Sequence, residues 1–286
     1  MRRTWKDLIE SPQTLDQPPK SQYRKGFFNP MSTDIDASPS PTSSLVSDVA
    51  FGLQATGNET APHNLPATLT RFVGRQTESE HLHTLLTEAR LISLVGPGGV
   101  GKTRLALQKA WHYVHLPASP FPDGVCFVPL GSAYTEDDLI FTLAETLQIP
   151  YFSNINLKKH LTNLLRPREM LFVLDNFEQL TPHAYLLVEI LQQAPHLRFL
   201  VTTRERLNVY GENAFPLTGL PLDATLETSP AAQLFVQNAK RVNPHFALTP
   251  ENRPHIAQIC RDVDGLPLAL EMASSWVRAL SPANLG

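Results

Sequence analysis

The chain has 286 residues, of which 42% are hydrophobic and 18% are charged, and its formal net charge at pH 7 is -3. A chain of this composition is typical of a globular protein, and it lacks the overall basic charge of many nucleic-acid-binding proteins. Because no apolar run approaches the roughly 20 residues of a transmembrane helix, and no apolar stretch of a secretory signal follows the basic N-terminus, we expect a cytoplasmic protein without membrane insertion.

The N-terminal segment, residues 1–63, is rich in Ser, Thr, Pro, Asp and Gln, as in "DASPSPTSS", and shows no apolar periodicity. A segment of this kind cannot bury enough apolar surface to offset the entropy cost of ordering. We therefore expect it to be disordered. Met31 follows a basic stretch and could be the true translation start, although an ordinary internal methionine explains it equally well.

From residue 64 the pattern changes to alternating helices and strands. Thr77 and Glu80 have the spacing of a capping box at the start of a helix. The apolar run at 91–95 ends at glycines and precedes a helical stretch. Similar runs, "VCFVPL", "MLFVLD" and "RFLVTT", are separated by helical stretches that begin near Thr135, near Asn156 and at Thr181-Pro182. Strands alternating with helices predict an α/β domain with a parallel sheet over residues 64–222.

After residue 222 the strand signals stop. The stretches "SPAAQLFVQNAKRV", "PENRPHIAQICRDV" and "LPLALEMASSWVRAL" each have helical character, which predicts a small helical domain over residues 223–286. Ser281-Pro282 has the pattern of a helix start. Too few residues follow for a stable helix, so we expect this domain to be truncated.

The stretch "GPGGVGKT", residues 96–103, fits the phosphate-loop pattern G-x-x-x-x-G-K-[ST] in full. Backbone N–H groups of such a loop converge on phosphate oxygens, and the following helix adds the positive end of its dipole. Lys102 is expected to reach the β and γ phosphates, and the Thr103 hydroxyl to bind Mg²⁺. The candidate nucleotide-binding residues here are Gly96, Pro97, Gly98, Gly99, Val100, Gly101, Lys102, Thr103 and Arg104.

Two further candidate site residues lie at or just after the ends of apolar runs that are expected to form strands. Asp175 ends "MLFVLD", where a carboxylate can hold Mg²⁺ from the side opposite the phosphate loop. An Asp at a strand end is often a turn or capping residue, but the phosphate loop favours the metal role. Arg204, in "VTTRERL", could contact the γ phosphate or could form a surface pair with Glu205 or Glu178; the sequence leaves both open.

Together these motifs resemble the NB-ARC-like NTPases of the STAND class over residues 64–280. The resemblance is carried by "NLPATLTRFVGR", "GPGGVGKT", "LFVLDNFEQL", "VTTRERL" and "GLPLALEMA", in this order. It implies a P-loop NTPase with sheet order 5-1-4-3-2, followed by a small helical domain. It also implies ATP or ADP with Mg²⁺ as cofactors and a role as a nucleotide-dependent signalling switch. By position, Val73 and Arg75 are expected beside the adenine and its ribose, and Pro267 near the base.

One departure from this family concerns hydrolysis. Many such ATPases have a second acidic residue directly after the metal-binding Asp, whereas this chain has Asn176. An amide can position water but cannot accept its proton. Glu178 is the nearest carboxylate, although helix capping or a surface pair explains it equally well. We expect slow hydrolysis, with Lys102, Asp175, Glu178 and Arg204 as the candidate catalytic residues.

Two other functions remain as alternatives. A small-molecule kinase or phosphotransferase would need an arginine-bearing lid, and none stands out. An ATPase fragment of a transcriptional regulator would need a helix-turn-helix module for direct DNA binding, and no segment supplies one. Domains that relatives carry beyond this point could mediate self-association or bind protein partners, and their absence would leave Leu266, Leu268 and Leu270 partly uncovered.

Two minor features complete the sequence. Cys126 and Cys260 lie far apart in apolar stretches, which predicts buried thiols and not a disulfide. His112 and His115 are three residues apart on the helix after the phosphate loop and could share a metal ion. Two ligands without a nearby Cys or acidic residue make a poor metal site.

Overall fold

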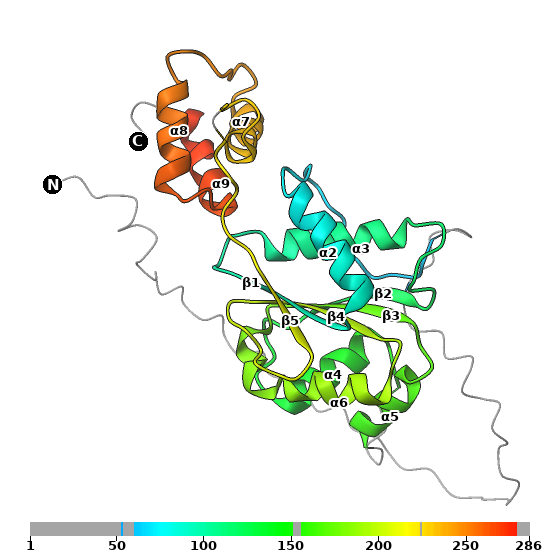
Figure 1. Cartoon of the computed structure of the whole chain (residues 1–286). Coiled ribbons are helices and arrows are strands. Elements are labelled where there is room, and N and C mark those ends of the chain that lie inside the picture. Colours follow the sequence, from blue (N-terminus) through cyan, green and yellow to red (C-terminus); the bar gives the residue numbers. More distant parts are fainter. Residues whose placement is uncertain (1–52, 54–59, 151–155, 224, 279–286) are drawn as a thin grey trace, which may run out of the picture. The chain divides into compact units, whose positions relative to one another are not determined.

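The computed structural model describes residues 53, 60–150, 156–223 and 225–278 of the chain (Figure 1). Most of the segment predicted to be disordered, including Met31, lies outside the described residues, as does the helix start predicted at Ser281-Pro282. No helix within the described ranges combines the length and apolarity needed to cross a membrane.

A sheet of five parallel strands forms the centre of the fold, in the order β2-β3-β4-β1-β5. The strands are β1 (Leu91–Val95), β2 (Gly124–Pro129), β3 (Met170–Asp175), β4 (Arg198–Thr203) and β5 (Glu212–Pro216). The order 5-1-4-3-2, which the resemblance implied, is therefore confirmed. Because β1, β4 and β3 are neighbours, the segments that follow these three strands meet at one edge of the sheet.

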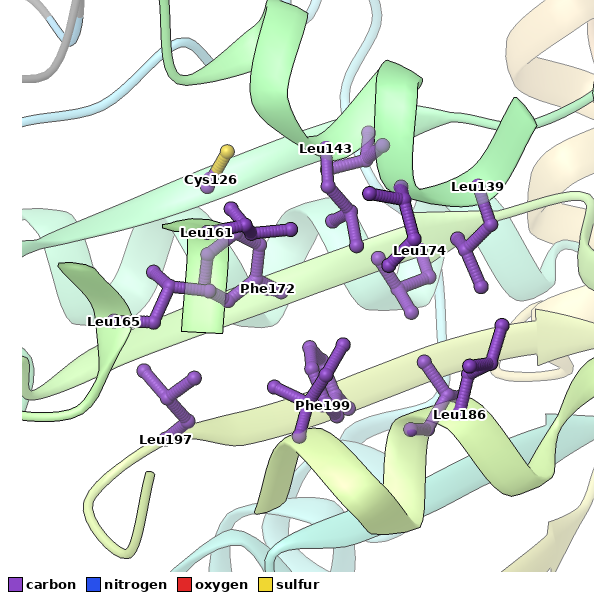
Figure 2. Packing of buried hydrophobic residues seen from close by; sticks show 14 of the residues in the cluster. Cys126, Leu139, Leu143, Leu161, Leu165, Phe172, Leu174, Leu186, Leu197 and Phe199 are labelled. Atoms are coloured by element: carbon purple, nitrogen blue, oxygen red, sulfur yellow. The ribbon is translucent and has the colours of Figure 1, made fainter. Parts of the chain in front are cut away.

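Helices cover both faces of the sheet (Figure 1). One face carries α2 (Gln76–Glu88) and α3 (Lys102–Val114), and the other carries α4 (Glu136–Thr146), α5 (Leu157–Leu165) and α6 (Tyr185–Gln193). Successive residues of β3 alternate between the two cores: Leu171 and Val173 face α3, while Phe172 and Leu174 face the other side. In Figure 2, leucines of α4, α5 and α6 converge on Phe172 and Leu174 of β3 and on Phe199 of β4.

Several helix starts follow the predicted signals, and two do not. Thr135 caps α4 in a capping box with Asp138, and the Asn156 side chain caps α5. The capping box predicted at Thr77 is wrong, because α2 begins at Gln76, and its N-cap is Arg75 in a left-handed conformation with φ 61°. The helix start predicted at Thr181-Pro182 also differs, since a 3-10 helix, η1 (Phe177–His183), occupies this stretch and α6 begins after it.

The three helices predicted after the sheet are present as α7 (Pro230–Val242), α8 (Arg253–Asp262) and α9 (Pro267–Ser275), followed by the short η2 (Trp276–Arg278). We call these elements the helical part. They bury a core of their own around Phe235, Ile256 and Leu270. Both cysteines are buried and free; burial raises the pKa of the Cys126 thiol, and it raises the pKa of Cys260 to about 11.

The segment after β5, residues 217–223, is the linker to the helical part, and it crosses the turn before α9 at two glycines. Both segments contain the tetrapeptide Gly-Leu-Pro-Leu, at residues 219–222 and 265–268. The Leu220 amide donates a hydrogen bond to the Gly265 carbonyl at 2.8 Å. A Cβ on Gly219 would lie 1.8 Å from the Asp264 oxygen, and one on Gly265, at φ +64°, would lie 2.1 Å from the Leu220 oxygen. Only glycines permit this close approach.

The segment before α2, residues 60–75, begins along the outer strand of the sheet. The Val125 amide of β2 donates to the Pro62 carbonyl at 2.9 Å. The Asn64 side-chain amide accepts from the Phe127 N–H at 2.6 Å and donates to the Phe127 carbonyl at 2.8 Å. The segment before α2 thereby pairs with β2, an edge strand of the sheet, as another strand would.

Candidate functional site

The phosphate loop, residues 96–103, connects β1 to α3. Gly99 and Gly101 have φ values of +77° and +95°, which is the left-handed region that favours glycine. The Lys102 ammonium donates to the carbonyls of Gly96 at 2.8 Å and Pro97 at 3.0 Å, so it lies across the loop. Burial lowers the pKa of Lys102, and the Glu178 carboxylate opposes this shift. Loop and helix together form a cradle for a phosphate group at the first turn of α3.

Asp175, the last residue of β3, contacts the start of α3 and the end of β4. Its Oδ1 accepts hydrogen bonds from the hydroxyls of Thr103 at 2.6 Å and Thr202 at 2.7 Å, and the residue is only 8% exposed. Hydroxyl and carboxylate oxygens are ligands that Mg²⁺ prefers. The side chains of Thr103 and Asp175 therefore fit the two protein ligands of a Mg²⁺ ion beside the phosphate loop.

Thr202 is a member of this site that the sequence analysis did not single out. Its hydroxyl donates to Asp175 and accepts from the Asn176 backbone N–H at 3.0 Å. It is fully buried at the end of β4. In the sequence, the feature that could have pointed to Thr202 is an apolar run that ends in two threonines. Its contact with Asp175 depends on the pairing of β3 with β4.

Glu178, in the first turn of η1, and Arg204, after β4, form an ion pair with Nε and Oε1 3.1 Å apart. Of the two pairs that the sequence left open for Arg204, the one with Glu178 is present. The other carboxylate oxygen, Oε2, is buried and has no hydrogen-bond partner among the described residues. Asn176, which precedes η1, has a left-handed backbone with φ 60°.

A cavity of about 310 Å³ lies over the phosphate loop. Its walls come from three sources: the loop with the start of α3, the segments after β3 and β4, and the first turns of α9. The predicted residues that line it are Gly98, Gly99, Gly101, Lys102, Thr103, Arg104, Glu178, Arg204 and Pro267, and residues not predicted are Leu268 and Glu271. Asn176 also lines it. The structure thus brings most of the predicted site residues together around one space.

Val73, Arg75 and Pro267, which the resemblance placed beside the nucleoside, line a separate small cavity with Gly101 and Arg104. Its volume is about 30 Å³. Such a space holds about one water molecule, far less than a purine ring needs. A nucleoside between these residues would therefore require the segment before α2 or the helical part to move.

The first turns of α9 contact the phosphate loop directly. The Leu268 N–H donates to the Gly99 carbonyl at 3.2 Å, and a Cβ on Gly99 would lie 2.8 Å from the Leu268 Cβ. Glu271 forms an ion pair with Arg104 at 3.4 Å. Arg104 also donates to the carbonyls of Thr70 and Arg71. It therefore connects α3 both to α9 and to the segment before α2.

The prediction of three partly uncovered leucines is correct for two of them. Leu268 is 53% exposed, and Leu266 is half-buried. Leu270 is fully buried, because it points into the core of the helical part. The exposed apolar side chains of this helix and of η2 are Leu268, Met272 and Trp276.

His112 and His115 have separate surroundings. His112 packs against His83 and Tyr113, whereas His115 stacks on Trp111 and its Nδ1 contacts the Trp111 carbonyl at 2.8 Å. The His83 Nδ1 is hydrogen-bonded to the Tyr113 hydroxyl at 2.8 Å. The structure does not bring the two predicted histidines together.

Comparison with known proteins gives consistent matches. Residues 75–239 match the family model described as the NB-ARC domain. A proposed HTH-type transcriptional regulator of Mycobacterium tuberculosis is 37% identical over 205 residues, which are 71% of this chain and 22% of that protein. An uncharacterised protein of the same species is 31% identical over 224 residues, 78% of this chain and 55% of that protein. The chain thus spans about a fifth to about half of the length of these relatives.

Among solved structures, a Walker-type ATPase of Pyrococcus abyssi has a similar fold. The TM-score is 0.51 at 17% sequence identity, and the match covers 78% of this chain and 73% of that one. At this level of identity the likeness concerns the fold alone.

Proposed function

The chain belongs to the NB-ARC domain family and contains a nucleotide-binding P-loop ATPase domain, and from this premise we propose that it is an ATP- and ADP-operated switch with slow hydrolysis. The observation that carries the proposal is the shared cavity over the phosphate loop, whose walls come both from the segments that follow β1, β3 and β4 and from α9. A nucleotide bound there touches the helical part as well as the loop, so a change in its phosphates changes contacts with both.

The residues around this cavity support a division of tasks. Backbone N–H groups of the phosphate loop and the first turn of α3 bind phosphate oxygens. Lys102, whose ammonium now contacts two loop carbonyls, supplies a positive charge to the same phosphates. Thr103 and Asp175 hold Mg²⁺, which neutralises phosphate charge when bound. We assign to Arg204, which lines the same cavity, contact with the terminal phosphate.

We base slow hydrolysis on the lack of a well-placed base among the residues that the structure describes around this cavity. Asn176 lines the cavity but its amide cannot take a proton from water. Glu178 is the nearest carboxylate, and one of its oxygens is engaged by Arg204. The other oxygen, Oε2, is buried. It can accept the proton of an attacking water molecule only if that molecule enters the cavity far enough to contact it. We infer that the chain holds ATP for long periods before phosphate is released.

The two alternatives have narrower support. For a kinase or phosphotransferase, an acceptor would have to enter beside α9, which contacts the loop at Gly99. The role of an ATPase fragment in a transcriptional regulator rests on the names of relatives, of which this chain covers 22%. Protein partners and self-association through further domains likewise remain proposals.

The proposal is tested by measuring the affinities for ATP, ADP and GTP with and without Mg²⁺, together with phosphate release. We expect binding of ATP and ADP and turnover far below the typical enzyme rate of about 10 s⁻¹. The absence of binding to any nucleotide would contradict the proposal as a whole. Rapid turnover would contradict slow hydrolysis only.

A further inference from the structure

Arg75 is a charged residue whose side chain is only 2% exposed. It is the N-cap of α2 and has a left-handed backbone, with φ 61°. From the nitrogen NH2 it donates to the Val100 carbonyl at 2.8 Å and to the Thr218 carbonyl at 2.7 Å, and from NH1 to Glu78 at 2.8 Å. One guanidinium group therefore joins the phosphate loop to the linker.

We propose that Arg75 is a positioning residue that couples the phosphate loop to the helical part through the linker. The inference rests on the proposed nucleotide binding, and it deepens it by naming a route from the loop to α9. Guanidinium suits this task because it stays charged and offers several donors in a fixed plane. Lysine has a single compact ammonium on a flexible stem and cannot reproduce this planar geometry.

The route starts in the peptide groups of the phosphate loop. A peptide group is planar, so the Val100 carbonyl and the Gly101 N–H move together. The Gly99 carbonyl and the Val100 N–H form the preceding peptide. A phosphate that binds the N–H side of these two peptides reorients the carbonyls on their other side. Those carbonyls are held by Arg75 and by the Leu268 N–H.

From Arg75 the route continues through the linker. Thr218, whose carbonyl Arg75 holds, directly precedes Gly219, and Gly219 packs against the Asp264 carbonyl. The next amide, that of Leu220, donates to Gly265 at 2.8 Å. Gly265 is followed within two residues by the start of α9. Every step is a hydrogen bond, a covalent bond or a close backbone contact, so a displacement of the loop reaches α9.

This role differs from a direct contact with the ribose, which the resemblance implied for Arg75. Both NH nitrogens already donate to protein acceptors. A residue that contacts the nucleotide affects its affinity, whereas a coupling residue affects what the rest of the chain does once the nucleotide is bound. The two roles separate when all variants are compared at saturating ADP.

The test is hydrogen–deuterium exchange of the full chain with and without saturating ADP, for the unsubstituted protein and for Arg75→Lys. In the unsubstituted protein we expect ADP to lower deuterium uptake in the phosphate loop and in α9. In Arg75→Lys we expect the loop to keep this protection and α9 to lose part of it, because the direct contact of Leu268 with Gly99 remains, with ADP affinity within about tenfold of the unsubstituted value. Glu78→Gln is the matched control, because it removes the ion pair but leaves both carbonyl contacts.

Each outcome decides between distinct claims. Protection of α9 in a folded Arg75→Lys protein equal to that in the unsubstituted protein, or loss of protection to the same extent in Glu78→Gln, would overturn the coupling role and leave the proposed function intact. No ADP binding by the unsubstituted chain would overturn the proposed function and the coupling with it. If Arg75→Lys does not fold, Arg75→Gln, which keeps a polar side chain without the charge, is measured in the same way and decides by the same criteria.

Discussion

Asp175 is the residue on which the metal side of the site depends. Its carboxylate joins Thr103 of α3 to Thr202 of β4 by hydrogen bonds of 2.6 and 2.7 Å. The pattern of an apolar run ending in Asp predicted this residue, since a buried parallel strand exposes its last side chain at the carboxyl edge. The partnership with Thr202 was not predictable from either run alone, because it depends on which strands are neighbours.

Substitution of Asp175 by Asn should weaken Mg²⁺-dependent binding selectively. We expect ATP affinity in the presence of Mg²⁺ to fall by roughly tenfold or more, as for the loss of a charged contact, while metal-free ADP binding stays nearly unchanged. Calorimetry with and without Mg²⁺ measures both, with Glu205→Gln as a control on an exposed neighbour. Equal losses in the two conditions would argue against a metal role.

Asn176 is the residue at which hydrolysis can be changed. If the absence of a base limits turnover, Asn176→Asp should raise phosphate release, because a carboxylate can accept the proton of the attacking water. The measurement is phosphate release at saturating ATP, with Asn176→Ala as the control for loss of the amide. No rise in Asn176→Asp, combined with a collapse of turnover in Glu178→Gln, would assign the role to Glu178 instead.

At the scale of elements, local capping signals predicted some boundaries and missed others. The start of α4 at Thr135 could be read from sequence because a capping box uses only residues within one turn. The start of α2 could not be predicted from local signals. There Arg75 adopts a left-handed backbone, and its side chain is engaged by two carbonyls distant in sequence, so tertiary contacts override the local signal.

The capping box of α4 gives a test at this scale. The Thr135 hydroxyl accepts from the Asp138 N–H at 3.1 Å, and we expect Thr135→Ala to lower the free energy of unfolding by about 1 kcal/mol. Thr135→Ser keeps the hydroxyl and serves as the control. Urea denaturation followed by circular dichroism measures both; an unchanged midpoint in Thr135→Ala would show that the cap contributes nothing to stability.

At the scale of the whole molecule, the connection between sheet and helical part depends on close backbone contacts. The repeated Gly-Leu-Pro-Leu sequence was visible, but its crossing at Gly219 and Gly265 depends on the path of the linker. The sheet order was predictable only through the resemblance to a known family. The pairing of residues 62–64 with β2 was not predicted, because a proline-containing segment without periodicity gives no strand signal.

A pair of glycine substitutions tests this crossing. Gly265 and Gly211 both have positive φ, but a Cβ would lie 2.1 Å from the Leu220 oxygen at Gly265 and meets nothing within 4 Å at Gly211. Gly211→Ala should cost about 1–2 kcal/mol for the backbone conformation alone. Gly265→Ala should cost clearly more, because linker and turn must separate. Urea denaturation compares the two; equal costs would mean that the crossing does not constrain the fold.

The most direct test of nucleotide binding at the phosphate loop is the ADP affinity of Lys102→Ala, measured by calorimetry beside the unsubstituted chain. Lys159→Ala, the same change at an exposed position of α5, is the control. We predict that Lys102→Ala lowers the affinity by roughly 10- to 100-fold, because a charge-assisted contact to phosphate is lost, while its urea midpoint and the affinity of Lys159→Ala stay unchanged. An ADP affinity of Lys102→Ala equal to that of the unsubstituted chain would contradict binding at this loop.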